Sequence, residues 1–423
     1  MRKMKDSGIE WIGEIPEDWE VGRVKNIAEL ISGYAFDSED LNIEGKNIVI
    51  RIGDIKDGSV DIENANKTNF NDEVLSFFQV KNNDVLIAMS GATVGKLGYV
   101  NFTPKNTYIN QRVGILRSSF SKFLYYALST NKFIEYILLE SIGSAQPNIS
   151  NDGIKNYPLC IPSLPEQQRI ADFLDRKCSE IDAVIAKTKA TIEEYKKLKQ
   201  SVITEADTKG IRGDRPMKDS GNIWYGSVPT EWDIRKMKYV FTIKKDIAGK
   251  EGYTVLSITL KGVVPKNISS NEGQLAENYS NYQLVAIGDF AMNHMDLLTG
   301  WVDISKHEGV TSPDYRVFIL NDTINNCKQY YLYLMQMCYS NRIFYGLGQG
   351  VSGMGRWRLQ ADKFLNFTIP IPPTQEQKEI ADFLDRKCSE IDKLITKKEQ
   401  LVVELESYKK SLIYEVVTGK RSV

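Results

Sequence analysis

The chain has 423 residues and a mass of 48.1 kDa, too long for one ordinary hydrophobic core, and this length predicts about two to four domains. Hydrophobic residues make up 42% and charged residues 26% of the sequence, so we expect a globular rather than a disordered protein. The formal net charge is −1, so a nucleic-acid partner can be inferred only from local charge.

Several classes of protein are excluded by what the sequence lacks. No apolar run approaches the roughly 20 residues of a membrane-spanning helix, and the first residues lack the apolar core of a secretion signal. The five cysteines form no C-x-x-C pair, so we expect neither a disulfide framework nor a cysteine zinc site. With only His294 and His307, a histidine-rich metal site is also excluded. We predict a protein of the reducing cytoplasm, without a membrane partner.

The opening of the chain and a later helical segment both recur in the second half. Three pairs of segments match, the first and third letter for letter: Met4–Gly8 with Met217–Gly221, Pro16–Trp19 with Pro229–Trp232, and Ile170–Asp182 with Ile380–Asp392. The whole protein is therefore predicted to be a tandem repeat.

The middles of the two halves differ from these repeated ends. Residues 21–150 and 234–360 hold short β-rich runs between Gly, Asn and Asp residues, with Asn47–Ile52 as one example. Only a few short stretches look helical, for example 122–140 and 327–339. No convincing sequence alignment relates the two middles, which indicates one frame carrying two different inserts.

A long helix is predicted after each middle. No Pro or Gly interrupts residues 166–206 or 376–417, so each run can form a helix of about 60 Å. Thr374 and Gln377 have the spacing of a capping box. Gly210 in the first half, like Gly419 in the second, marks the helix end.

The apolar residues of both helices follow a 4-3 spacing that favours a partner helix. The stripe consists of Leu174, Cys178, Ile181, Ile185, Thr188, Ile192, Tyr195 and Val202 in the first helix and Leu384, Cys388, Ile391, Ile395, Val402, Leu405, Leu412 and Val416 in the second. The alternative is an amphipathic helix that lies on its own domain. Two matched helices favour antiparallel packing on each other, with pseudo-two-fold symmetry.

The expected fold class is thus α+β: a tandem repeat of two α/β domains, each followed by a long helix, with the helices paired as an antiparallel coiled coil. The expected boundaries are domain 1 at 1–165, helix 1 at 166–208, a linker at 209–216, domain 2 at 217–375 and helix 2 at 376–423.

Several fragments imitate catalytic motifs without completing them. Gly91–Leu97 resembles a phosphate-binding loop but is one residue short and lacks the Ser or Thr that binds magnesium. Gly346–Gly350 follows no strand, so we interpret it as a mobile loop rather than a dinucleotide site. No Asn-Pro-Pro-aromatic tetrapeptide of an amino-methyltransferase is present. We expect no catalytic residue and no metal ligand.

Local charge favours binding instead. Residues 81–132 carry seven basic residues and one acid, Asp84, and residues 235–266 carry eight basic residues and two acids. Both stretches also hold Asn, Gln, Ser, Thr and Tyr, side chains that contact base edges and phosphates. A solvated charged surface is the alternative explanation.

The Pro-Glu-x-Trp opening, the P-x-x-E-Q helix start (in the second half Pro373–Gln377) and the two Ile-Ala-Asp-Phe-Leu-Asp helices together resemble the specificity subunit of type I restriction-modification systems. The resemblance covers the full length. It implies two target-recognition domains held apart by an antiparallel helix pair, with Ile170–Asp182 and Ile380–Asp392 as scaffold and partner-docking surface.

The resemblance also implies partners and a role. The chain would be a non-catalytic subunit that binds a bipartite site in double-stranded DNA, two methyltransferase subunits and, through them, restriction translocase subunits. The methyltransferase partner, not this chain, would bind S-adenosylmethionine and methylate adenine. Recurrent family positions and the basic stretches together give the candidate DNA-binding set: Ser90, Thr93, Lys96, Asn110, Gln111, Arg112, Lys244, Lys245, Ser312, Tyr315, Arg356 and Arg358.

Three other functions compete with this one. The chain could be the specificity chain of a related single-complex restriction enzyme that cuts beside its site. It could be a structural scaffold that joins proteins without nucleic acid. An enzyme in its own right is disfavoured by the incomplete motifs.

Overall fold

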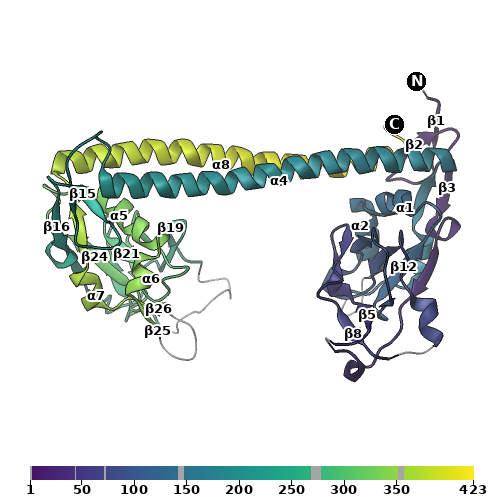
Figure 1. Cartoon of the computed structure of the whole chain (residues 1–423), viewed down its shortest axis with the longest axis horizontal. Helices are drawn as coiled ribbons and strands as arrows, with labels where there is room; N and C mark the ends of the chain where they lie inside the picture. Colours follow the sequence, from purple (N-terminus) through teal and green to yellow (C-terminus); the bar gives the residue numbers. More distant parts are fainter. Residues whose placement is uncertain (1, 43, 71–72, 142–146, 268–277, 351–356) are drawn as a thin grey trace. The chain divides into compact units, whose positions relative to one another are not determined.

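The structure, a computed structural model, describes residues 2–42, 44–70, 73–141, 147–267, 278–350 and 357–423. The chain forms two compact units (Figure 1): unit 1 comprises Met1–Lys189 with Gln400–Val423, and unit 2 comprises Ala190–Glu399. Two long helices, α4 (Leu164–Lys209) and α8 (Thr374–Val417), each contribute to both units. The boundaries expected from the sequence follow the chain order, whereas the compact units divide both helices.

The body of unit 1 contains a four-stranded antiparallel sheet in the order β10-β9-β12-β4 and a three-stranded sheet in the order β11-β5-β8. In the second sheet, β11 runs parallel to β5. The strands are β1 (Met4–Asp6), β2 (Glu14–Pro16), β3 (Glu20–Arg23), β4 (Glu29–Ser32), β5 (Asn47–Ile50), β6 (Ile55–Lys56), β7 (Ser59–Val60), β8 (Asn66–Thr68), β9 (Val85–Ala88), β10 (Leu97–Tyr99), β11 (Thr107–Ile109), β12 (Val113–Arg117) and β13 (Pro158–Ile161). The short helices are α1 (Ser121–Leu128), α2 (Asn131–Glu140) and α3 (Asn151–Asn156).

The body of unit 2 contains a four-stranded antiparallel sheet in the order β17-β24-β21-β22. The strands are β14 (Met217–Asp219), β15 (Ser227–Pro229), β16 (Asp233–Lys236), β17 (Phe241–Lys244), β18 (Leu256–Thr259), β19 (Gly262–Pro265), β20 (Gln283–Val285), β21 (Phe290–Met292), β22 (Val302–Ile304), β23 (Gly309–Thr311), β24 (Arg316–Leu320), β25 (Gln349–Gly350), β26 (Trp357–Arg358) and β27 (Thr368–Ile371). The short helices are α5 (Lys328–Ser340), α6 (Ile343–Leu347) and α7 (Ala361–Asn366).

The two middles share one topology although their sequences show no convincing alignment. The sheet order β10-β9-β12-β4 of unit 1 corresponds to β22-β21-β24-β17 of unit 2, and the pairs β3–β13 and β16–β27 also correspond. Asp84, before β9, accepts the Lys81 backbone N–H at 2.7 Å, and Asp289, before β21, accepts that of Ala286 at 2.9 Å. The predicted tandem repeat of two α/β domains is therefore confirmed in the order of the main sheet, although the residues of the two middles differ.

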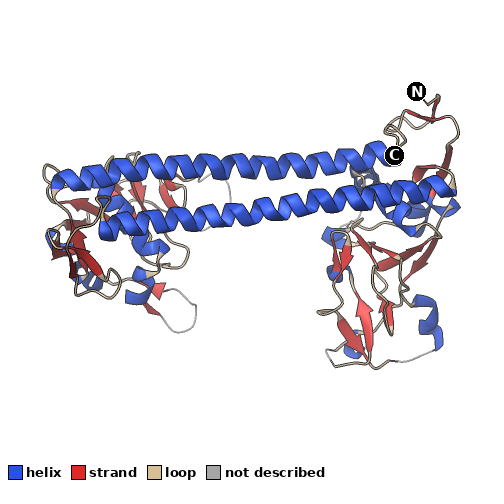
Figure 2. Ribbon diagram, turned by 45° about the horizontal axis from the view of Figure 1, so that its top comes forward, coloured by secondary structure: helices blue, strands red, loops and turns tan. Residues whose placement is uncertain are grey.

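The two long helices pack on each other within each unit, and both are continuous (Figure 2). In unit 1, Lys409 pairs with Asp182 at 2.6 Å; in unit 2, their repeat equivalents Lys199 and Asp392 pair at 2.7 Å. Residue numbers rise along α4 as they fall along α8, so the pairing is antiparallel. The roles of α4 and α8 are exchanged between the units, as a pseudo-two-fold repeat requires.

The predicted apolar stripe is the buried face of this helix pair. Its buried members are Leu174, Cys178, Ile181, Ile185, Thr188, Ile192, Leu384, Cys388, Ile391, Val402, Leu412 and Val416. In unit 1 the stripe is continuous with the core of the body, which includes Trp19 and Phe123. In unit 2 it joins the core around Trp232 and Phe318. The two alternatives for the helices therefore both hold: each helix packs on its partner and on a globular body.

The helix ends partly follow the sequence. Gly210 and Gly419 have φ of +75° and +72°, so both end their helices in the left-handed conformation that favours glycine. The capping box is wrong. Thr374 is the first residue of α8, where its hydroxyl donates to the Asn325 carbonyl at 2.6 Å, and the side-chain amide of Gln377 donates to the Pro372 carbonyl at 2.9 Å. Tertiary partners have replaced the local cap.

The mobile loop expected at Gly346–Gly350 is also wrong, because this segment forms the end of α6 and β25. A Cβ on Gly346 would lie 2.7 Å from the Trp224 ring, and one on Gly348 would lie 2.5 Å from the Trp357 ring. These glycines are required by close packing against aromatic rings. Among the described residues, no helix is both long and apolar enough to cross a membrane.

Candidate nucleic-acid interface

The first candidate turn joins β11 to β12 in unit 1. The Asn110 backbone N–H donates to Ile50 at 2.9 Å, and the Asn110 carbonyl accepts the Val113 N–H at 2.8 Å, which closes the turn. The Arg112 carbonyl accepts the N–H of Met89, the residue after β9, at 2.9 Å. These backbone bonds fix the turn and leave the side chains of Gln111 and Arg112 exposed.

The turn that follows β9 lies beside the first one. Gly91 has a φ of +78° and donates its N–H to the Pro147 carbonyl at 2.9 Å. Ser90 therefore joins Gln111 and Arg112 in lining a cavity of about 530 Å³, together with residues 147–151. Because this cavity presents guanidinium, amide and hydroxyl groups, it suits the acceptor-rich edges of bases and the oxygens of phosphates.

Thr93 and Lys96, the remaining candidates of this turn, are not among the residues that line this cavity. The buried hydroxyls of Ser90 and Thr93 have no hydrogen-bond partner among the described residues. The Lys96 ammonium lies 3.7 Å from the Asp57 carboxylate, which is almost fully exposed. Such a surface pair is weak, so Lys96 can exchange this partner for a phosphate at little free-energy expense.

The second candidate turn joins β23 to β24 in unit 2, at the position that the β11–β12 turn has in unit 1. The Tyr315 N–H donates to Ser312 at 2.9 Å, and the side-chain amide of Gln283 holds the carbonyls of Ser312 and Tyr315 at 3.1 and 2.8 Å. Both residues line a cavity of about 400 Å³ with the acids Asp296 and Asp314. The sequence candidates thus fall on equivalent turns that carry different side chains.

Lys244 has an ion-pair partner within the fold. Its ammonium pairs at 2.7 Å with Asp289, whose side chain is only 9% exposed. In unit 1 the equivalent Asp84 pairs at 2.7 Å with Arg117. Arg117 and Lys244 thus each pair with the buried aspartate that directly precedes a central strand of their own unit. Lys245, the next candidate, is exposed.

The last two candidates lie close together in the chain. Arg356 lies outside the described residues. Arg358 lies on β26, and its Nε is buried without a hydrogen-bond partner among the described residues. Sequence reasoning missed its neighbours His294 and Arg316. An arginine at the first position of a buried strand was the available signal.

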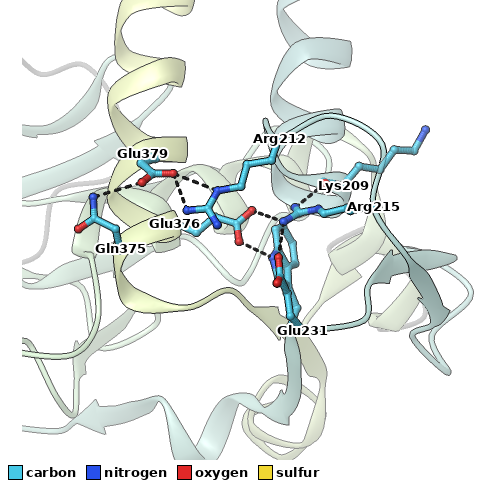
Figure 3. Close-up of polar contacts among 8 residues, drawn as sticks. Lys209, Arg212, Arg215, Glu231, Gln375, Glu376 and Glu379 are labelled. Atoms are coloured by element: carbon cyan, nitrogen blue, oxygen red, sulfur yellow. Dashed lines mark hydrogen bonds and ion pairs between the residues drawn. The ribbon is translucent and has the colours of Figure 1, made fainter.

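The repeated motifs form a clamp at the start of each long helix, shown for unit 2 in Figure 3. Glu376 is fully buried, accepts the indole N–H of Trp232 at 3.0 Å and pairs with Arg215 at 2.7 Å. Arg215 also donates to the Lys209 carbonyl at 2.7 Å and to Glu231 at 2.8 Å. The clamp therefore ties the end of α4 to the beginning of α8 within unit 2.

Unit 1 repeats this clamp with its own residues. Trp19 donates to Glu166 at 3.0 Å, and Arg2 donates to the same carboxylate at 2.9 Å. The hydrogen bond from Arg2 holds the pKa of Glu166 below its ordinary value. The Trp and Glu positions of the repeated motifs thus have a structural role, and they do not belong to the candidate DNA-contacting set.

Comparisons with known proteins agree with this architecture. Residues 16–194 and 229–404 match the family described as "Type I restriction modification DNA specificity domain". The MjaVIII specificity subunit of Methanocaldococcus jannaschii is 25% identical, with 96% of this chain and 93% of the relative covered. The EcoKI specificity subunit of Escherichia coli is 26% identical over 45% of this chain and 43% of its own length.

Solved structures share the fold at 13% identity. A chain from a structural study of complex assembly and conformational transition of the type I R-M system has a TM-score of 0.70, with 96% of this chain and 99% of the other covered. The HsdS subunit from Thermoanaerobacter tengcongensis has a TM-score of 0.53, with 96% and 98% covered. Because the family match spans most of both halves, this chain belongs to the type I restriction-modification DNA specificity family.

Proposed function

We propose that this chain is the DNA specificity subunit of a type I restriction-modification complex, and that each unit reads one half of a bipartite site in double-stranded DNA. The main support is the pair of equivalent turns, β11–β12 and β23–β24, which are held by backbone bonds on one scaffold but carry different side chains. Two domains that recognise different half-sites need the same scaffold with different side chains at these turns.

The two cavities differ in chemistry. The unit 1 cavity presents the donors Arg112, Gln111 and Asn148. Arginine pairs well with guanine and the amides with adenine. The unit 2 cavity includes the carboxylates Asp296 and Asp314, which accept hydrogen bonds of the kind that the cytosine amino group donates. Different half-sites follow from this difference.

Partner docking is supported by the letter-for-letter repeat of Ile170–Asp182 and Ile380–Asp392. Packing constrains only the buried positions, yet the exposed ones are also identical, for example Arg176 with Arg386 and Glu180 with Glu390. Two identical surfaces suit two copies of one partner. We propose that these are methyltransferase subunits, which bind S-adenosylmethionine and bring restriction translocase subunits to a complex in the cytoplasm. This chain contributes recognition and no catalytic step.

The test exchanges the DNA-recognition segment of one unit. Residues 21–150 are replaced by those of a family member with a different target, and the methylated sites of a host that carries the complex are sequenced. One half-site should change and the other should stay. The matched control exchanges residues 234–360 and should change only the second half-site. If both half-sites changed in either chimera, or if the parental complex showed no sequence preference, the two-reader proposal would be wrong.

A further inference from the structure

Among the buried polar atoms of unit 2 that lack hydrogen-bond partners in the described residues, three come from side chains that lie close to one another. They are Nδ1 of His294, Nη1 of Arg316 and Nε of Arg358. The backbone of Leu359 connects them, since its N–H donates to the His294 carbonyl at 3.0 Å and its carbonyl accepts Nη2 of Arg316 at 2.9 Å. Two guanidinium groups and an imidazole therefore gather around one segment.

These side chains are held in place rather than free to leave. Arg316 is 4% exposed, and its guanidinium carbon lies 4.8 Å from the centre of the Phe364 ring. Burial lowers the pKa of Arg316 to about 10, and burial beside the two guanidinium groups lowers the pKa of His294 to about 3. Within the described ranges, neither Arg316 nor Arg358 forms an ion pair with a carboxylate.

Unit 1 shows that the fold does not need this charge. The Ile149 N–H donates to the Met89 carbonyl at 3.0 Å, the counterpart of the bond between Leu359 and His294. Met89 therefore stands where unit 2 has His294, and Asn148 stands in place of Arg358. Gly114 pairs with Ile87 of β9 as Arg316 pairs with Met292 of β21, so Gly114 stands in place of Arg316. The same scaffold therefore forms with one apolar side chain, one amide and a glycine at these positions.

Buried cations that form no ion pair lower the stability of the folded state. Replacing such a cation by a well-packed apolar residue often raises that stability. An arrangement that is kept despite this effect points to a ligand that supplies the missing acceptors. The charge is positive and the free atoms are N–H donors or an imidazole nitrogen, so the ligand is an anion with several oxygens. Phosphate has this chemistry.

We propose that His294, Arg316 and Arg358 bind one backbone phosphate of the DNA half-site that unit 2 reads. The inference rests on the proposed function and adds an asymmetry to it, because the described part of unit 1 holds no such cluster. Arg358 is half-buried and makes the first contact, while Arg316 supports the phosphate from the interior.

The test uses the full chain in its assembled complex and a duplex that carries the recognised site. Arg358→Gln should weaken binding roughly tenfold, the loss of one charge-assisted hydrogen bond, and should reduce the slope of log affinity against log salt by about 0.9. Lys218→Gln is the matched control, since it removes the same charge from β14 of unit 2 and should leave the slope unchanged. Duplexes with single neutral methylphosphonates should locate the contact. One position in the second half-site should weaken the parental complex but not the Arg358→Gln complex.

Arg316→Met separates a ligand site from a structural one. If the cluster serves a ligand, this variant should melt at a higher temperature than the parent and bind DNA more weakly. A lower melting temperature with unchanged DNA binding would overturn the proposal. Inorganic phosphate alone should raise the melting temperature of the parent more than that of Arg358→Gln.

The outcomes are distinct from those that test the proposed function. If the parental complex binds its site but Arg358→Gln changes neither the affinity nor the salt slope, the phosphate site is wrong and the specificity subunit stands. If Arg358→Gln loses discrimination at one base pair while the slope is unchanged, Arg358 reads a base and the phosphate assignment is wrong. If the parental complex shows no site preference at all, the proposed function itself fails.

Discussion

Units 1 and 2 have the same strand order, the same clamp at a helix start and the same aspartate before a central strand, yet they differ at the positions around the β9 and β21 strand ends. Where a side chain faces the helix pair, the two units often carry the same residue. Where it lies at the turns that follow the central strands, they do not. The comparison therefore distinguishes residues that the fold requires from residues that vary between the units without changing the fold.

Some differences lie in the interior, where they have energetic consequences. Asp207 near the end of α4 is fully buried, and its carboxylate oxygens have no hydrogen-bond partner among the described residues, whereas the repeat places the apolar Val417 at the matching position of α8. The carboxylate Asp84 is held by Arg117 from β12, while Asp289 is held by Lys244 from β17. Each unit can therefore serve as the control for the other.

The largest expected effect comes from the clamp. Glu376→Gln keeps the shape but leaves Arg215 without its buried charged partner, so the free energy of unfolding of unit 2 should fall by about 3–5 kcal/mol. Each arginine keeps a second acid, Glu231 or Asp18, but Glu166→Gln should have a smaller effect on unit 1, because the Arg2–Glu166 pair is more exposed than the Arg215–Glu376 pair. Hydrogen exchange measured for each unit of the full chain checks this. Equal losses in both units would contradict the difference in burial.

The next effect concerns Lys244. Lys244→Met should lower the free energy of unfolding by about 2–3 kcal/mol, because it leaves the buried Asp289 carboxylate without its cation. The neighbouring Lys245→Met is the control, and as an exposed change it should alter stability by about 0.5 kcal/mol or less. Urea denaturation compares the two. If the Lys244→Met protein were as stable as the parent but bound DNA more weakly, Lys244 would be a DNA contact rather than a structural residue.

Replacing Asp207 by the residue of the other unit should stabilise unit 2. Burial raises the pKa of Asp207 well above its ordinary value, so the folded state binds this proton more tightly than the unfolded chain does. The stability of the parent therefore falls as the pH rises above the unfolded pKa. Asp207→Val should gain about 2 kcal/mol at pH 8 and less at pH 5.

Thermal melting at the two pH values tests this prediction. Val417→Asp in unit 1 is the reverse exchange and should destabilise, more at pH 8 than at pH 5. If the gain from Asp207→Val were the same at both pH values, the carboxyl group would not be the cause.

The smallest effects should lie at the two turns. Arg112→Ala and Tyr315→Ala change exposed or half-buried side chains, so each should weaken binding by about 1 kcal/mol and relax discrimination only in the half-site of its own unit. Binding of the assembled complex to duplexes with single base changes measures this. A loss of discrimination in both half-sites from one substitution would break the separation between the units.

Local patterns predicted much of the frame. The long helices were predictable because a 4-3 apolar spacing over an unbroken run has few other solutions. Their ends were marked by Gly210 and Gly419. Ser312 and Tyr315 lie on the β23–β24 turn, which corresponds to the β11–β12 turn that carries Asn110–Arg112 in unit 1, and contact of these residues with DNA stays a prediction.

What could not be predicted depends on partners distant in the sequence. The Thr374 cap was replaced by Asn325, and Lys244 was engaged by Asp289, neither of which a local pattern reveals. The shared topology of the middles was hidden because strand order depends on burial that many sequences satisfy. The cluster around Arg316 joins residues that are distant in the sequence. The equivalent backbone bonds of Leu359 and Ile149 identify the positions that correspond to it in unit 1.

Unit 1 is assembled from both ends of the chain, with the N- and C-terminal segments side by side and the Tyr414 hydroxyl donating to the Trp11 carbonyl at 2.6 Å (Figures 1 and 2). During synthesis the N-terminal domain of most proteins folds first. Here unit 2 is continuous in the chain, whereas unit 1 cannot be completed until Gln400–Val423 has left the ribosome. Until then the apolar stripe of α4 from Leu174 to Ile185 lacks its partner helix α8, so a nascent or prematurely terminated chain exposes more of this stripe than the complete chain does.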